Sequence, residues 1–172
     1  MTVPRNVGAA APAGARILGI DPGTLRLGYA VIEAVWAAGR PRLHYLECGV
    51  IKAPTGDIAT RLFAIATDLA EVITEFAPRE CAIEKAFGGK NPASALALGQ
   101  ARGAVMLLAA QHGMASHEYA PAYVKRMIAG HGAATKAAIA QRVQLLFELV
   151  RPPAADAADA LAIACCHALV RS

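Results

Sequence analysis

Four acidic side chains stand in apolar surroundings, where a bare charge is costly to bury. Asp21 ends the apolar run 17–20, and Glu84 ends the similar run 80–83. Asp156 and Asp159 are three residues apart, on one face of a predicted apolar helix. Convergence of these carboxylates would favour divalent cations, and ligands that are all carboxylates select Mg²⁺ or Mn²⁺ over zinc. Two such ions, about 4 Å apart, promote phosphodiester hydrolysis.

Two of these acids also have a structural interpretation. The Asp21 side chain is able to cap its own Asp-Pro-Gly turn. Asp156 falls in the first turn of its helix, where the helix dipole favours an anion. Asp159 lies one turn deeper and has no such explanation, so the pair favours a functional role.

The elements that must position these acids follow from hydrophobic periodicity and from turn residues. The first two strands form a hairpin and continue as an antiparallel meander, whereas later strands alternate with helices. We therefore expect an α/β domain with a five-stranded mixed sheet flanked by helices, in which the first and fourth strands are neighbours. Strands are predicted at 17–20, 27–35, 42–51, 80–84 and 114–119, and helices at 57–76, 91–113, 122–128, 135–149 and 154–169.

Composition predicts one soluble globular domain. The chain has 172 residues, of which 56% are hydrophobic and 17% charged, enough for a single core. An uninterrupted apolar run of the ~18 residues needed to span a membrane is absent from the sequence, so we expect no membrane partner. Residues 1–15 are predicted to be a disordered extension without the features of a secretion signal, and 16–172 the folded domain. Four cysteines without CxxC spacing indicate reduced thiols and a cytoplasmic location.

Charge is unevenly distributed along the chain. Residues 85–151 contain eight Lys or Arg and two Asp or Glu, whereas the rest of the chain contains nine and eleven. A basic half is typical of a nucleic-acid-binding protein, although an ordinary solvated surface has the same composition.

Five segments together resemble one family. They are ILGIDPGTLRLGYAVIE, AIEKAF, NPASALALGQARG, GHGAATK and DAADALAIA, which span about residues 16–169. In this order they resemble RuvC, the bacterial crossover junction endodeoxyribonuclease family, which has a ribonuclease H-like fold. DPGT alone would not distinguish it from sugar kinases or Hsp70-type ATPases.

The resemblance implies roles for individual residues. Asp21, Glu84, Asp156 and Asp159 are expected to be the catalytic carboxylates and to hold two Mg²⁺ ions per subunit, with Mn²⁺ as a substitute. Lys136 is expected to take part in catalysis as well as in DNA contact. Phe87 falls at the position of the family's aromatic wedge, where it would stack on an unpaired base. The expected DNA-binding residues are Phe87, Lys90, Arg102, Lys125 and Lys136.

The resemblance also implies a function and partners. The expected activity is the resolution of Holliday junctions by symmetric paired nicks in four-way junction DNA, as part of recombination and repair. A two-fold homodimer suits this substrate, and the small-residue helix 91–112 is the candidate interface. RuvA and RuvB, the branch-migration complex, are expected partners. The alternatives are a nucleic-acid-binding module with a vestigial site, half of a sugar-kinase-like ATPase, and a ribonuclease acting on RNA precursors.

Overall fold

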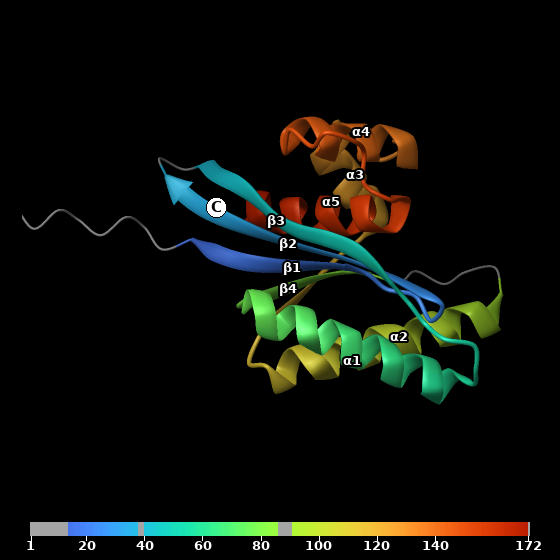
Figure 1. The fold of residues 1–172 in the computed structure, drawn as a ribbon. Helices are drawn as coiled ribbons and strands as arrows, with labels where there is room; N and C mark the ends of the chain where they lie inside the picture. The colour runs from blue at the N-terminus through green and yellow to red at the C-terminus, as the bar shows by residue number, and fades with distance from the viewer. Residues whose placement is uncertain (1–13, 38–39, 86–90, 172) are drawn as a thin grey trace, which may run out of the picture.

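The computed structural model describes residues 14–37, 40–85 and 91–171 of the chain. They form five strands and five helices in the order βββαβαβααα, shown in Figure 1. The elements are β1 (Ala15–Asp21), β2 (Arg26–Ala37), β3 (Arg40–Lys52), α1 (Ile58–Phe76), β4 (Glu80–Glu84), α2 (Pro92–Gln111), β5 (Ala115–Tyr119), α3 (Pro121–Ala129), α4 (Lys136–Leu146) and α5 (Ala155–Val170).

The strands form one mixed sheet in the order β3-β2-β1-β4-β5. β1, β2 and β3 pair as an antiparallel meander, whereas β4 lies parallel to β1 and β5 lies parallel to β4. The predicted five-stranded mixed sheet, with the first and fourth strands side by side, is confirmed. Parallel pairing requires a crossover between the strands, and α1 and α2 supply it.

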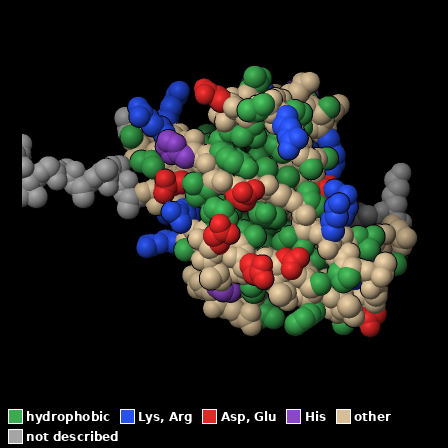
Figure 2. All heavy atoms as spheres, viewed as in Figure 1, with side chains coloured by type: hydrophobic (Ala, Val, Ile, Leu, Met, Phe, Trp, Pro, Cys, Tyr) green, Lys and Arg blue, Asp and Glu red, His purple; other side chains and the backbone are tan. Residues whose placement is uncertain are grey.

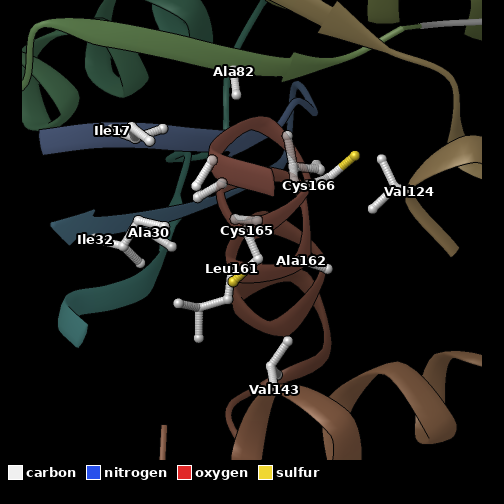
Figure 3. Close-up of a cluster of buried hydrophobic side chains, with 14 of the residues drawn as sticks. Ile17, Ala30, Ile32, Ala82, Val124, Val143, Leu161, Ala162, Cys165 and Cys166 are labelled. Carbon is white, nitrogen blue, oxygen red and sulfur yellow. The ribbon is translucent and has the colours of Figure 1, made fainter. Parts of the chain in front are cut away.

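Helices cover both faces of the sheet, with α3, α4 and α5 on one face and α1 and α2 on the other (Figure 1). Successive side chains of a strand point to opposite faces. Accordingly Ile17 belongs to the core under α5, and Leu18 belongs to the core under α1 and α2. Figure 3 shows the first of these cores, in which Ile17, Ile32 and Ala82 of three strands surround the buried α5.

Small residues bring α5 against the sheet. α5 is buried almost all round, and most of its buried residues are alanines. Gly19 of β1 lies beneath it, and a Cβ on Gly19 would stand 2.2 Å from the carbonyl oxygen of Ala160. The central strand therefore needs glycine here, because any side chain would push the helix away.

The element boundaries agree with the predictions to within a few residues. β1 begins at Ala15, which pairs with Ala34, one residue before the predicted start of the folded domain at residue 16. α4 ends at Leu146 and not at 149, because Glu148 adopts a left-handed φ of 52° that a helix cannot continue through. Residues 1–13 of the predicted N-terminal extension lie outside the described residues.

One helix of the described part, α2, is long and apolar enough to cross a membrane by length and composition alone. Gln100 and Arg102 interrupt its apolar sequence. Of the 18-residue stretch of α2 that meets these criteria, 22% is buried within this chain.

Candidate active site

Asp21 and Glu84 come from neighbouring strands and point to the same face of the sheet. The parallel register pairs Ile20 with Ile83, which places the next residues, Asp21 and Glu84, side by side at the strand ends. Residues 17 and 19 face α5, so the two-residue alternation turns Asp21 toward α5 as well. The predicted convergence of these two acids is confirmed.

The other two acids come from the first turns of α5. Asp156 and Asp159 are three residues apart on the helix, and their side chains are 27% and 16% exposed. Each is held by a cation from a distant part of the chain. Arg26 donates from Nε to Oδ2 of Asp156 at 2.8 Å, and Lys136 donates from Nζ to Oδ2 of Asp159 at 2.7 Å.

A cavity of about 130 Å³ opens among these groups. Asp21, Glu84 and Asp159 line it together with Lys125 and Lys136, and its other lining residues are mostly apolar. The structure thus brings three of the four predicted acids into one pocket with two of the predicted lysines. Asp156 does not line this cavity; it is paired with Arg26, and its charge adds to the repulsion on Asp21.

The protonation of the site follows from burial and from repulsion between the acids. Burial, followed by the negative charges of Glu84 and Asp159, raises the pKa of Asp21 to about 7. Burial and the charge of Asp159 also raise the pKa of Glu84. The hydrogen bond to Asp159 raises the pKa of Lys136, which keeps its ammonium charged. A site of mutually repelling carboxylates with all-oxygen donors suits hard divalent cations such as Mg²⁺.

The contacts do not support the turn-capping interpretation of Asp21, whereas Asp156 does lie in the first turn of α5. Among the side-chain hydrogen bonds of the described residues, none joins the Asp21 carboxylate to its own turn. The N-cap of α5 is Ala154, which forms no side-chain cap, and Asp156 is bonded to Arg26. The helix dipole favours an anion at this position, which fits the structural role expected of Asp156, and its metal-binding role stays a prediction.

The predicted acids lie near one another, but among the described residues no three of them have carboxylate oxygens that all lie within 4.8 Å of one another. Among the described residues, the group of three potential ligands with donor atoms within 4.8 Å of one another is Glu80, His117 and His167, and not the predicted acids. Arg26 and Lys136 each contact one carboxylate oxygen, Oδ2 of Asp156 and Oδ2 of Asp159 respectively.

The remaining predicted residues fall into three groups. Lys125 and Lys136 lie at the pocket. Arg102 lies on α2, with a side chain 19% exposed, and forms an ion pair with Glu118 of β5. Its role in DNA contact remains a prediction and would require this ion pair to open. Phe87 and Lys90 lie outside the described residues.

Sequence reasoning missed Arg26. Its type and its place at the start of β2 carry no signal of their own, because a lone exposed arginine is usually a solvated charge. Its pairing with Asp156, 130 residues away, depends on the packing of α5 across the first hairpin.

The charge pattern of the surface can be followed in Figure 2. On the face shown, Lys and Arg side chains lie toward the two ends of the sheet and beside α4, and acidic side chains lie between them. On this face the Lys and Arg side chains of the protein do not form one continuous patch.

Comparison with known proteins gives one consistent family. The family model described as "Crossover junction endodeoxyribonuclease RuvC" matches residues 17–167. The protein of that description from Marinobacter nauticus is 49% identical over 152 residues, which cover 88% of this chain and 85% of the relative. The one from Azorhizobium caulinodans is 47% identical and covers 89% of both chains.

Solved structures agree with the sequence comparison. The structure described as T. thermophilus RuvC in complex with Holliday junction substrate superposes with a TM-score of 0.81 at 36% identity, covering 91% of this chain and 94% of that one. The yeast mitochondrial Holliday junction resolvase Ydc2, at 14% identity and a TM-score of 0.60 over 95% and 83% of the two chains, shares the fold. The predicted ribonuclease H-like fold is confirmed. This chain belongs to the crossover junction endodeoxyribonuclease RuvC family.

Proposed function

We propose that this protein resolves Holliday junctions by paired, metal-dependent nicks in four-way junction DNA. The observation that carries the proposal is the shared pocket of Asp21, Glu84 and Asp159 with Lys125 and Lys136. Family membership supplies the substrate, since the relative with the 0.81 superposition binds a Holliday junction. The basic excess of residues 85–151 favours a polyanionic partner.

Asp21, Glu84, Asp156 and Asp159 would hold the divalent ions, two Mg²⁺ per subunit with Mn²⁺ as a substitute. When bound, such ions activate a water nucleophile and stabilise the charge that develops on the phosphate. The donor set fits, because four carboxylates, once ionised, match the charge of two divalent cations and offer oxygen ligands alone.

The chain's own residues prepare this site in three ways. Lys136 holds the Asp159 carboxylate at 2.7 Å, and its largely exposed side chain is free to turn toward a phosphate once Asp159 binds a cation. Lys125 and Lys136 both oppose the rise in the pKa of Glu84 and so favour its ionised, ligating form. The apolar lining supplied by Val124, Ile139 and Ile163 limits water around the acids.

A nicking assay on a synthetic four-way DNA junction, with and without Mg²⁺, tests the proposal. The wild type should nick two opposed strands only with the metal, leaving 5′-phosphate and 3′-hydroxyl ends. Asp21→Asn should bind the junction but not cut it, because most affinity comes from phosphate contacts. Asp68→Asn, on the exposed face of α1, is the matched control and should cut normally. Full activity of Asp21→Asn would overturn the assignment.

The same assay separates the alternative functions. A wild-type protein that binds the junction without cutting it under any divalent cation would be a binding module. Preference for an RNA junction over the DNA one would indicate a ribonuclease.

We further propose a homodimer that uses α2. The buried residues of α2 occupy one side only, whereas Leu96 and Leu107 are 66% and 62% exposed. A Cβ built on Gly99 or Gly103 meets nothing within 4 Å in this chain, so the small-residue face of α2 leaves room for the backbone of a second subunit. Burial of this apolar face against a two-fold copy would suit the symmetry of the substrate.

Light scattering during size-exclusion chromatography tests the dimer. Leu107→Glu should shift the protein to a monomer and abolish paired nicking. Leu145→Glu, at an equally exposed leucine of α4, should leave the mass unchanged. A wild-type monomer at micromolar concentration, or a dimer unaffected by Leu107→Glu, would contradict the interface.

The expected RuvA–RuvB partnership and the cytoplasmic location are part of the same proposal. Four free cysteines, three of them buried, suit a reducing compartment. Reconstituting junction resolution with and without RuvA and RuvB tests the partnership directly.

A further inference from the structure

A second group of potential ligands lies at the other end of the same strand and helix that carry the catalytic acids. Glu80 is the first residue of β4, four residues before Glu84, and His167 is near the end of α5, eight residues after Asp159. At the rises of a strand and a helix these separations are about 13 Å and about 12 Å. The third member, His117, lies at the centre of β5.

The donor atoms of this group are close enough for one ion. One donor atom from each of Glu80, His117 and His167 lies within 4.8 Å of the other two. Nε2 of His167 is 2.6 Å from Oε2 of Glu80, and the two imidazole rings have centroids 4.5 Å apart. Metal–ligand bonds of about 2.1 Å in a tetrahedral site separate donors by roughly 3.4 Å. Side-chain adjustments of about an ångström would therefore close the site.

Neighbouring groups orient these ligands as outer partners do in metal sites. The Tyr119 hydroxyl lies 2.6 Å from Nδ1 of His167, and Nη1 of Arg171 donates to Oε1 of Glu80 at 2.8 Å. Without a metal, Nε2–H of His167 donates to Glu80 and Nδ1 accepts from Tyr119. With a metal on Nε2, the ring proton of His167 is on Nδ1, and Nδ1–H donates a hydrogen bond to the Tyr119 hydroxyl. A hydroxyl serves in either direction, so the same contacts support both forms.

The ligand types and access indicate the kind of ion. Two imidazoles and one carboxylate suit a borderline transition metal and not Mg²⁺, which prefers oxygen ligands alone. A cavity of about 540 Å³, lined by Glu80, His117, Tyr119, His167 and Arg171 among others, gives an ion a route to the site and leaves room for water as a fourth ligand.

We propose that Glu80, His117 and His167 form a binding site for a divalent transition-metal ion, with Zn²⁺ as the occupant, which ties β4 and β5 to the C-terminal end of α5. The site is separate from the catalytic carboxylates and acts on stability. Bound Zn²⁺ would stabilise the folded state by RT ln(1 + c/Kd), where c is the free Zn²⁺ concentration.

Zinc titration of EDTA-stripped protein in excess Mg²⁺ tests the site, in the Asp21→Asn background so that the catalytic acids are disabled. We expect one equivalent of Zn²⁺ bound and a thermal midpoint raised by about 5–10 °C when zinc is about 100-fold above its Kd. Co²⁺ in place of Zn²⁺ should give visible bands of a four- or five-coordinate site without thiolate charge transfer, which excludes the cysteines.

His117→Asn is the decisive variant, because His117 is the solvent-facing member and its loss leaves Glu80 paired with His167 and Arg171. It should keep the metal-free melting temperature and lose the zinc-induced rise. His44→Asn, at an exposed histidine of β3, should keep that rise. The proposal is overturned if the stripped protein takes up no Zn²⁺, or if His117→Asn binds it as the parent does.

Discussion

Gly28 of β2 lies directly against the backbone of Asp156 at the start of α5. A Cβ on Gly28 would stand 2.1 Å from the Asp156 carbonyl oxygen, far inside van der Waals contact. Gly28 is also the strand partner of Asp21. One glycine therefore sets the distance between the strand that carries Asp21 and the helix that carries Asp156 and Asp159.

Gly28→Ala should lower both stability and nicking, because the added methyl forces α5 away from β2 and with it two of the acids. Overpacking of this kind costs about 1–3 kcal/mol in the free energy of unfolding. Urea unfolding and the junction-nicking rate measure the two effects. Asp68→Asn, on the exposed face of α1, is the control and should change neither stability nor nicking. Wild-type activity in Gly28→Ala would show that the close approach does not position the acids.

Arg26→Ala should raise the affinity of the metal-free protein for Mn²⁺ several-fold. Arg26 holds Oδ2 of Asp156 at 2.8 Å, so a cation that binds Asp156 must displace it. The pair is half exposed, and its loss should change the free energy of unfolding by less than about 1 kcal/mol. Calorimetric titration with Mn²⁺ measures the affinity, with Arg40→Ala on β3 as the control. Weaker Mn²⁺ binding by Arg26→Ala would mean that the arginine orients Asp156 as a ligand.

Lys136→Gln should reduce nicking by roughly 10²-fold, the usual effect of removing one stabilising charge from a reaction site. Two losses combine in this variant, since Asp159 loses its 2.7 Å partner and the pocket loses positive charge facing the phosphate. Single-turnover nicking at saturating Mg²⁺ measures the effect. Lys52→Gln, at the exposed end of β3, controls for general loss of positive charge. Equal rates for Lys136→Gln and the wild type would confine Lys136 to a structural ion pair.

The stability of the metal-free protein should fall as pH rises, and Asp21 should cause part of the fall. The pKa of Asp21 is raised from 3.8 to about 7 in the folded state, mainly by burial. Between these values the folded chain holds a proton that the unfolded chain has released, so ionisation disfavours folding as pH increases, and the loss is complete above about 7.

Asp21→Asn removes this titration. The variant should be more stable than the wild type at pH 8 by up to about 4 kcal/mol, and the difference should vanish near pH 4. Urea unfolding in EDTA at pH 4, 6 and 8 measures it. A pH-independent difference between the two proteins would show that Asp21 ionises normally in the fold.

Phe87→Ala should reduce junction resolution while leaving the fold intact. This prediction depends on the sequence, which places Phe87 beside two glycines at the family's aromatic position, where stacking on an unpaired base is expected. Comparison of nicking rates with far-UV circular dichroism separates the two effects. An unchanged rate would exclude a wedge role for Phe87.

The sequence by itself determined the local structure and the identity of the acids. Strand and helix periodicity, the Asp-Pro-Gly turn and Pro92 at the start of α2 fixed the elements to within a few residues, because these signals act between neighbours along the chain. Asp21 and Glu84 were recognisable as acids that end apolar runs. Parallel placement of their strands was then enough to predict that they meet.

Only the tertiary structure decided which groups those acids contact. Arg26 holds Asp156, Lys136 holds Asp159 and Arg102 is turned to Glu118. The gathering of Glu80, His117 and His167 likewise depends on the way α5 crosses β4 and β5. The partners in these contacts are 16 to 130 residues apart, as with Arg102 and Glu118 or Arg26 and Asp156. Local periodicity has no information about such pairs, since helix packing and strand register select them only when the whole core forms.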